Sequence, residues 1–179
     1  LGLDGNITAR NDRGVAEIRT EYDFAGNVIR QCYLNIEDGE TEAVIRRDIG
    51  YASFESIYEN GNCVETRYFD IDGELTLCTD GGYAIIKKRY NDEGNCISER
   101  YYGQENQPII STKYDCAGIN YYYNERGELT DREYIGLNGQ RIIRNDYGCA
   151  QIKRMYDEYG NIILESYLNL EGKPVVRTD

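Results

Sequence analysis

Short segments in which apolar and polar side chains alternate recur along the chain. Residues 16–22 read Ala-Glu-Ile-Arg-Thr-Glu-Tyr, with charged side chains at every second position, and residues 150–156 follow a similar pattern. A period of two predicts β-strands with one face toward a core. Each segment is followed by a second one, such as 161–168, which we expect to be the return strand of a hairpin. The expected inward positions of the return strands are Ile29, Val64, Ile97 and Ile163.

The connections between these segments have the composition of tight turns. Asp157 stands first and Gly160 fourth in one of them, as in a type I turn. The connection in residues 59–62 is one residue shorter and contains Asn60-Gly61, which predicts a type I′ turn. We expect this turn to absorb the deletion without exchanging the faces of the strands.

The alternating segments belong to a repeat. Each copy opens with a residue, usually Gly, that is followed two positions later by Ala; a Tyr comes eight positions after the opening, then a turn Gly, and a second Tyr seven positions after that Gly. The openings are Gly14, Gly50, Gly82, Asp115 and Gly148, spaced 36, 32, 33 and 33 residues apart. The first tyrosines are 22, 58, 90, 123 and 156, and the second tyrosines are Tyr33, Tyr68, Tyr101, Tyr134 and Tyr167. Such regularity predicts one repeat array over residues 1–179.

The units of this array are 14–49, 50–81, 82–114, 115–147 and 148–179, and a partial unit occupies 1–13. Residues 1–5 match 135–139, the end of a unit, and Asp179 falls where the next opening is due. We therefore expect the chain to be a stretch of a longer array.

A third segment of each unit usually carries an apolar pair, such as Ile142-Ile143 or Val175-Val176. Because both faces of the return strand carry apolar residues, we expect this segment to cover the second face, either as a short strand or as an extended crossing. With two prolines and no long helical periodicity, the chain is predicted to be all-β: an antiparallel β-hairpin repeat array of about five units, as a solenoid or a curled single sheet.

Composition narrows the function classes. The chain has 20 Lys and Arg against 32 Asp and Glu, a net charge of −12, which disfavours nucleic acid and anionic membrane surfaces as partners. No apolar run is long enough for membrane insertion by this segment. The absence of His removes the commonest general base and metal ligand. We expect no catalytic residues, no cofactor and no metal.

The run Tyr-Asp-x-x-Gly-Asn occurs at residues 22–27 and 156–161, and in altered form at 90–95. It resembles the YD repeat of Rhs-type bacterial proteins. In that family the repeats form β-hairpins that wind into a shell or filament on secreted or surface-attached proteins, and the repeat region is not catalytic. The resemblance therefore implies an extracellular or cell-surface scaffold of bacterial origin. This chain differs in its longer unit, its Gly-x-Ala opening and its third segment.

Tyrosine is the residue type that suggests binding. We expect the second tyrosines of the repeat to be packing residues, because they share a face with the inward Ile positions, although an exposed aromatic ladder would stack on sugar rings. Tyrosines outside the repeat positions are better candidates for ligand contact: Tyr102, Tyr114, Tyr122, Tyr147 and Tyr159.

Other candidate chemistry is weaker. The six cysteines lack Cys-x-x-Cys spacing, and equivalent residues two strands apart would be about 9.6 Å from each other, so we expect free thiols; one full coil per unit would permit bridges. The segment Asp70-Ile71-Asp72-Gly73-Glu74 begins like a calcium loop but lacks the distal Glu, so an Asx turn is the better interpretation.

The function predicted from these observations is a non-catalytic structural and interaction segment of a larger bacterial surface or secreted protein. The alternative is a carbohydrate-binding repeat module that uses tyrosine ladders, so protein and glycan are the expected partners. A third alternative, an enzyme with paired carboxylates, requires a deep pocket with two perturbed acids.

Overall fold

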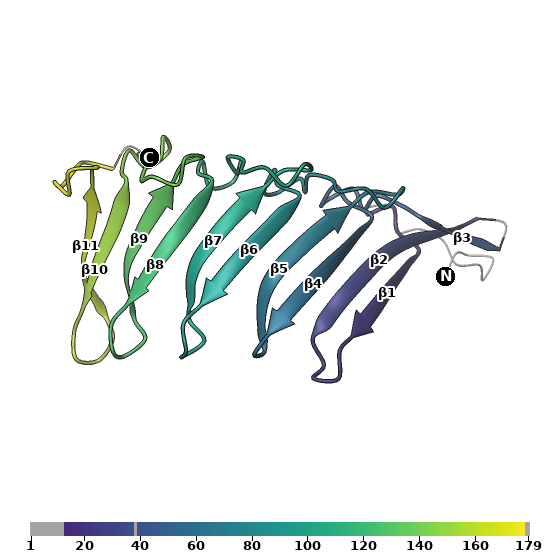
Figure 1. Cartoon of the computed structure of the whole chain (residues 1–179), viewed down its shortest axis with the longest axis horizontal. Coiled ribbons are helices and arrows are strands. Elements are labelled where there is room, and N and C mark those ends of the chain that lie inside the picture. The colour runs from purple at the N-terminus through teal and green to yellow at the C-terminus, as the bar shows by residue number, and fades with distance from the viewer. Residues whose placement is uncertain (1–12, 38, 178–179) are drawn as a thin grey trace. The chain divides into compact units, whose positions relative to one another are not determined.

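The structure is a computed structural model that describes residues 13–37 and 39–177. It is all-β, as predicted, and its strands follow one another in antiparallel hairpins (Figure 1). The partial unit predicted at 1–13 lies almost wholly outside the described residues. Within the described ranges, no helix has the length and apolarity that crossing a membrane would require. The strands are β1 (Glu17–Tyr22), β2 (Val28–Glu37), β3 (Glu40–Ala43), β4 (Ser53–Glu59), β5 (Asn62–Phe69), β6 (Ile85–Tyr90), β7 (Cys96–Tyr102), β8 (Gly118–Tyr123), β9 (Leu129–Ile135), β10 (Gln151–Tyr156) and β11 (Ile162–Leu168).

The strands form one sheet in the order β1-β2-β4-β5-β6-β7-β8-β9-β10-β11, with β3 paired to β2. The order in the sheet is thus the order in the sequence, as expected for a hairpin array. By its internal contacts the chain divides into two compact units. The N-terminal unit runs to Ile86 and includes Tyr102–Gln107, and the C-terminal unit comprises Lys87–Tyr101 and the chain from Pro108 onward.

The hairpin turns have the predicted types. In the β10–β11 turn the Gly160 amide donates to the Asp157 carbonyl, and the Asp157 carboxylate accepts bonds from two amides further along the turn. In the β4–β5 turn, Asn60 and Gly61 both have positive φ, 51° and 78°, as a type I′ turn requires. The two hairpins nevertheless have their register shift at the same place, beside the first tyrosine of the repeat. The deletion is therefore absorbed in the turn, and the strand faces are kept.

The Gly-x-Ala opening forms a corner between successive hairpins. Gly148 has φ 67°, and Asp115, which replaces Gly at this position, has φ 49°. The Ala that follows is fully buried in the case of Ala150, and it connects two strands: its amide donates to Leu168, and its carbonyl accepts from the amide of Tyr134. A left-handed corner with no room for a larger side chain explains why this dipeptide pattern marks every unit.

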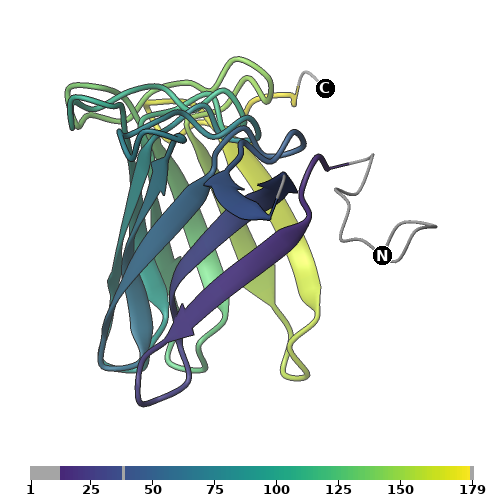
Figure 2. The same cartoon turned by 90° about the vertical axis from the view of Figure 1, so that its right-hand side faces the viewer.

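The third segment is a strand in only one described unit, where β3 pairs with β2. In the last repeat unit, 148–179, the third segment makes a further tight turn at 169–172. It then returns to the end of the preceding strand, where the Val175 amide donates to the Tyr167 carbonyl. These returning segments lie at the end of the strands opposite to the hairpin turns (Figures 1 and 2).

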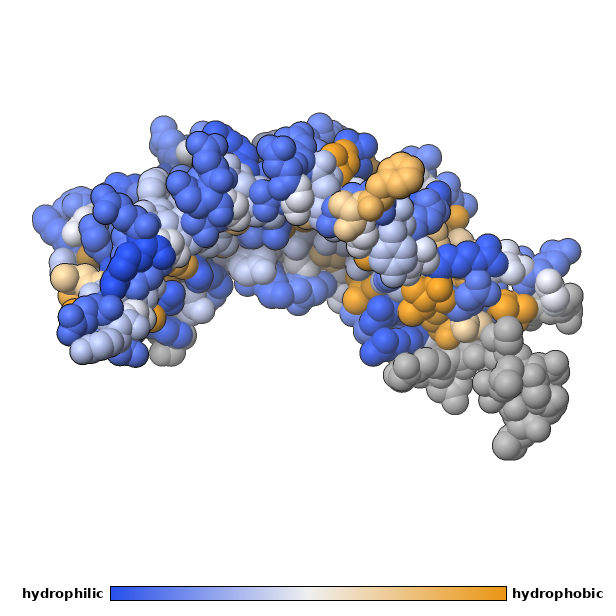
Figure 3. All heavy atoms as spheres, turned by 90° about the horizontal axis from the view of Figure 1, so that it is seen from below, coloured by the Kyte–Doolittle hydropathy of each residue, from blue (hydrophilic) through white to orange (hydrophobic). Residues whose placement is uncertain are grey.

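The expectation that the third segment covers the second face of the return strand is wrong for the turn half of the last hairpin. Ile163, predicted to point inward, is 62% exposed, and Ile162 beside it is 50% exposed. The reason is that the third segment returns only to the corner end of the strand, near Tyr167 and Leu168. From the turn side, the surface is mainly hydrophilic with separate apolar patches (Figure 3).

The second tyrosines of the repeat are packing residues, as predicted. Tyr33, Tyr101 and Tyr134 are at most 2% exposed, and Tyr68 and Tyr167 are half-buried. In the N-terminal unit, rings from strands and corners alternate in a packed series: Tyr33, Tyr51, Tyr68 and Tyr83, with centroids 4.6 to 6.0 Å apart. The tyrosine ladder of this unit is therefore internal, since Tyr33 and Tyr83 are buried and Tyr51 and Tyr68 are half-buried.

Candidate functional site

Neighbouring hairpins pair with each other over a much shorter length than the two strands inside a hairpin. In the C-terminal unit, β8 and β9 pair over six residues, but β7 and β8 pair over three, Ser98–Arg100 with Gly118–Asn120, and β9 and β10 also over three. All of these short pairings lie at the corner end of the strands. The hairpins therefore separate toward their turns.

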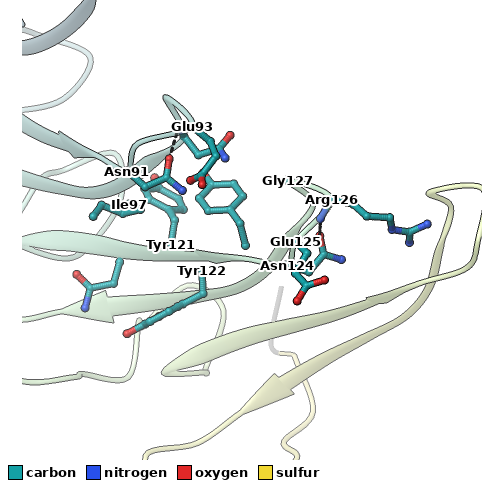
Figure 4. Close-up of a pocket in the computed structure, with 12 residues that line it drawn as sticks. Asn91, Glu93, Ile97, Tyr121, Tyr122, Asn124, Glu125, Arg126 and Gly127 are labelled. Carbon is teal, nitrogen blue, oxygen red and sulfur yellow. Dashed lines mark hydrogen bonds between the residues drawn. The ribbon is translucent and has the colours of Figure 1, made fainter. Parts of the chain in front are cut away.

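One of these separations forms a groove of about 730 Å³, which we call the turn-end groove. Its walls come from the β6–β7 turn, from β8 and from the β8–β9 turn (Figure 4). Asparagine and tyrosine predominate among its residues, which are Asn91, Glu93, Asn95, Ile97, Asn120, Tyr121, Tyr122, Tyr123, Asn124, Glu125, Arg126 and Gly127.

Three successive tyrosines of β8 border the groove, and each has a hydrogen-bonded hydroxyl. Tyr123 donates to the Cys96 carbonyl at 2.9 Å, and Tyr121 donates to Glu99 at 3.2 Å. Tyr122 lies on the opposite face of the strand and donates to Glu133 at 2.8 Å (Figure 4). Burial raises the pKa of all three phenols. They therefore remain protonated hydrogen-bond donors at neutral pH, with rings available for stacking.

The two turns that flank the groove are held by asparagine side chains. The Asn91 side-chain oxygen accepts from the Asn95 amide at 2.8 Å, and that of Asn124 accepts from the Arg126 and Glu128 amides at 3.0 Å. These Asx turns fix the backbone of both walls.

The turns on either side of the groove and of the next separation differ at one position. In the β8–β9 turn, Arg126 reaches across and donates to the carbonyls of Asp157 and Glu158 at 2.7 and 3.0 Å. The equivalent residue of the β6–β7 turn is Glu93, a carboxylate, which has no hydrogen to donate to a neighbouring carbonyl. Arg126 thus joins the two turns across the β9–β10 separation, whereas at the groove the equivalent turn residue is an acid, and the arginine contact between β7 and β8 is made further from the turns, by Arg100 to the Ile119 carbonyl.

Each hairpin carries one cross-strand pair of side chains at the variable inward position of the repeat, which we call the polar row. In the N-terminal unit the pairs are neutral: Thr20 with Gln31 and Ser56 with Thr66, both at 3.1 Å. In the C-terminal unit they are charged or aromatic: Lys88 with Glu99 at 3.2 Å, Tyr121 with Arg132 at 5.6 Å from ring centroid to Cζ, and Arg154 with Glu165 at 2.7 Å. The variable inward position of the repeat is therefore the place where units differ chemically.

The charged pairs shift the titration of their members. Burial lowers the pKa of Lys88, but the charge and hydrogen bond of Glu99 outweigh it, so the pKa is raised. Hydrogen bonds from Tyr167 and then from Arg154 lower the pKa of Glu165. Lys88 and Glu165 are consequently charged at neutral pH.

The tyrosines predicted as ligand contacts do not come together. Tyr122 borders the turn-end groove and Tyr159 is 81% exposed at the tip of the β10–β11 turn. Tyr114 stacks on Tyr101 with centroids 5.4 Å apart, and Tyr147 lies between Arg144 and Arg177, whose Cζ atoms are 4.3 and 4.6 Å from its centroid. Tyr102, at the end of β7, is half-buried and belongs to the N-terminal unit.

Sequence reasoning missed most of the groove. The repeat pattern includes Tyr123 among its first tyrosines, and Asn91 and Asn95 belong to a run that resembles Tyr-Asp-x-x-Gly-Asn, but neither Tyr121 nor Asn124 was singled out from the sequence. The missing information was the short pairing between hairpins, for which the repeat pattern carries no signal. The sequence signal that could have pointed to the groove is Glu93, an acid at the turn position where the next unit has Arg126.

The other predicted chemistry is structural. The Asp70 carboxylate accepts bonds from the amides of Asp72 and Glu74, which confirms the Asx turn. None of the six cysteines, all of which lie in the described residues, forms a disulfide. Burial raises the pKa of the Cys116 thiol to about 11.

Comparison with known proteins adds no assignment. No protein-family model and no curated protein matches the sequence. Function must therefore be argued from the groove and the polar row.

Proposed function

We propose that this chain is a non-enzymatic interaction segment of a larger bacterial surface or secreted protein, in which the hairpin framework holds the turn-end groove open for a partner. The observation that carries the proposal is a groove between two hairpins whose turns are not joined by an arginine of the kind that Arg126 supplies at the next pair of turns. The walls of that groove offer amide groups, phenol hydroxyls and aromatic rings. Such groups bind by hydrogen bonding and stacking.

The protonation state of the groove supports binding rather than acid–base chemistry. The phenols that border it have raised pKa values, so they do not serve as bases at neutral pH. The net charge of −12 favours basic or neutral partners over anionic polymers. The resemblance of the Tyr-Asp-x-x-Gly-Asn runs to YD repeats agrees with a scaffold at the cell surface.

A carbohydrate is the second candidate partner. Asparagine side chains together with a tyrosine ring are suited to sugar hydroxyls and to the apolar face of a sugar ring. Tyr122, 46% exposed, points to the face of β8 opposite to Tyr121 and Tyr123, the face on which Asn120 also lies, so a sugar would stack on that side of the groove.

The test closes the groove by design. Glu93→Arg should reproduce the bridge that Arg126 makes to the next turn, while Glu93→Gln removes the charge without adding a bridge. The wild-type chain, both variants and Tyr122→Ala are applied to a glycan array and to a panel of bacterial surface-protein fragments, and bound ligands are recovered for mass analysis.

We expect saturable binding that Glu93→Gln retains and Glu93→Arg abolishes, with the recovered ligand chemically unchanged. Loss of glycan binding in Tyr122→Ala would select the carbohydrate. A cleaved or modified ligand would overturn the non-enzymatic assignment, and binding that Glu93→Arg leaves intact would show that the groove is not the site.

A further inference from the structure

The second tyrosine of each unit normally donates its hydroxyl hydrogen to an acceptor two residues earlier in the same strand. Tyr33 donates to Gln31 at 2.8 Å, Tyr101 donates to Glu99 at 3.0 Å, and Tyr167 donates to Glu165. In β9 the residue at this position is Arg132, which carries donors and no acceptor. The Tyr134 hydroxyl therefore has a donor beside it where the equivalent tyrosines have an acceptor.

Three buried donors lie together here, since burial raises the pKa of the Tyr134 phenol and the neighbouring guanidiniums of Arg132 and Arg144 both oppose that rise. The Tyr134 hydroxyl and the Nε atoms of Arg132 and Arg144 are buried and make no hydrogen bond among the described residues. Tyr134 is 0% exposed and Arg144 is 7% exposed. The Arg144 guanidinium lies over the Tyr134 ring, with Cζ 5.1 Å from the centroid, and that of Arg132 lies over Tyr121.

The acids that could neutralise these donors are engaged elsewhere. Glu99 binds Lys88 and the hydroxyls of two tyrosines, and Glu165 binds Arg154. Asp146 pairs with the Nη2 atom of Arg144 and leaves its Nε unpartnered.

The acids next to Arg132 in the sequence do not reach it either. Asp131 and Glu133 alternate with Arg132 along β9 and point to the opposite face, where Asp131 accepts from Gln151 and Glu133 accepts from Tyr122. The lateral neighbours of Arg132 in the sheet are Tyr121 and Ile152, neither of them an acceptor of its charge.

An unmatched buried donor is costly, because nothing replaces the water that it has lost, and three such donors around one phenol favour the arrival of an acceptor. We infer that Arg132, Tyr134 and Arg144 bind a carboxylate, so that a ligand of this protein carries a carboxylic acid, either as a small organic acid or as an acidic sugar. Arg132 is half-buried, so part of its side chain reaches solvent although its Nε atom does not. Tyr121, which it contacts, also borders the turn-end groove.

The experiment follows the guanidinium Nε–H NMR signals of the isotope-labelled full chain during titration with acetate, glucuronate and glucose at constant ionic strength. The variants are Arg132→Glu, which restores the acceptor present at Glu99 and Glu165, and Arg132→Gln, which restores that at Gln31. Arg141→Gln is the matched control, because Arg141 is an exposed cation of the opposite face paired with Glu133.

We expect the Nε–H signals of Arg132 and Arg144 to move downfield and saturate with both carboxylates and not with glucose. The apparent affinity should fall about tenfold or more in the two Arg132 variants, in line with the loss of a charge-assisted hydrogen bond, and stay unchanged in Arg141→Gln. Tighter binding of glucuronate than of acetate would identify an acidic sugar, and equal binding would identify a small acid.

Signals that fail to saturate, an equal response to glucose, or an equal response at Arg141 would overturn the site. Because the titration reports on the arginines directly, it does so whether or not the turn-end groove binds a partner. Unfolding curves of the Arg132 variants verify that each one is folded, as the presence of Glu or Gln in sister units leads us to expect.

Discussion

The hydroxyl of Tyr123 donates to the carbonyl oxygen of Cys96 across the separation between two hairpins, at 2.9 Å. Tyr156 makes the equivalent bond to Leu129 across the next separation, at 2.7 Å. Both tyrosines are first tyrosines of the repeat, and both bonds lie beyond the last paired residues of the neighbouring strands. The first tyrosine thus ties adjacent hairpins together where their backbones no longer pair.

Tyr156→Phe should therefore lower stability without changing the fold. The variant removes the hydrogen bond to the half-buried Leu129 carbonyl, and the free energy of unfolding should fall by about 1 kcal/mol. Urea unfolding of the variant and the wild type measures the difference. Tyr122→Phe is the control, because its bond to Glu133 lies on the exposed face and should contribute less. Equal effects of the two substitutions would contradict the tie between hairpins.

The corner glycine gives a second prediction. Gly148 has φ 67°, in the left-handed region that costs a residue with a Cβ atom about 1–2 kcal/mol. Gly148→Ala should therefore reduce the free energy of unfolding by about that amount, whereas Gly148→Asp should cost less, since Asp115 occupies the same corner with φ 49°. Thermal and urea unfolding of the two variants decide this. The prediction fails if Ala is tolerated better than Asp.

The sequence was sufficient to predict the hairpins, their turn types and the burial of the second tyrosines, because each depends on local pattern. Alternation defines the strands, and Asn60-Gly61 defines a turn by its allowed φ values alone. The opening Gly and Ala were recognised as a repeat mark, although their role as a corner required the hydrogen bonds between Ala150 and both neighbouring strands.

The site was less predictable because it depends on contacts between units. The groove lies where Glu93 stands in the place of a bridging arginine, and the carboxylate site arises where Arg132 stands in the place of an acceptor. Both are departures from the repeat, so they become visible only when equivalent positions are known to face each other in space. Exposure of Ile163 is a further example, since alternation alone predicted it to be inward.

Alkaline pH should destabilise the chain. Burial raises the pKa of Cys116 from 9.0 to about 11 and raises that of Tyr101 and Tyr121 well above the usual 10.0. A raised pKa means that the folded state holds the proton more tightly, so the stabilisation is complete below pH 9 and is lost as the pH rises through 11. We expect the free energy of unfolding to fall across this window. The near-ultraviolet absorbance of tyrosinate should show the buried phenols ionising together with unfolding, and gradual ionisation of all eighteen tyrosines in a folded chain would contradict the prediction.

Arg132→Glu should make the ligand-free chain more stable, although it removes a cation from an acidic protein. In the wild type, the Tyr134 hydroxyl and two guanidinium Nε atoms are buried without acceptors. A glutamate at 132 would accept from Tyr134, as Glu99 accepts from Tyr101, and its charge would face Arg144. Gaining one satisfied hydrogen bond to a charged group, less the lost contact with the Tyr121 ring, should raise the free energy of unfolding by about 1 kcal/mol.

Urea unfolding without added carboxylate measures this change in stability. The difference should shrink when acetate is added, because the ligand stabilises only the wild type. A less stable Arg132→Glu variant would mean that the fold already supplies hydrogen-bond partners for Arg132.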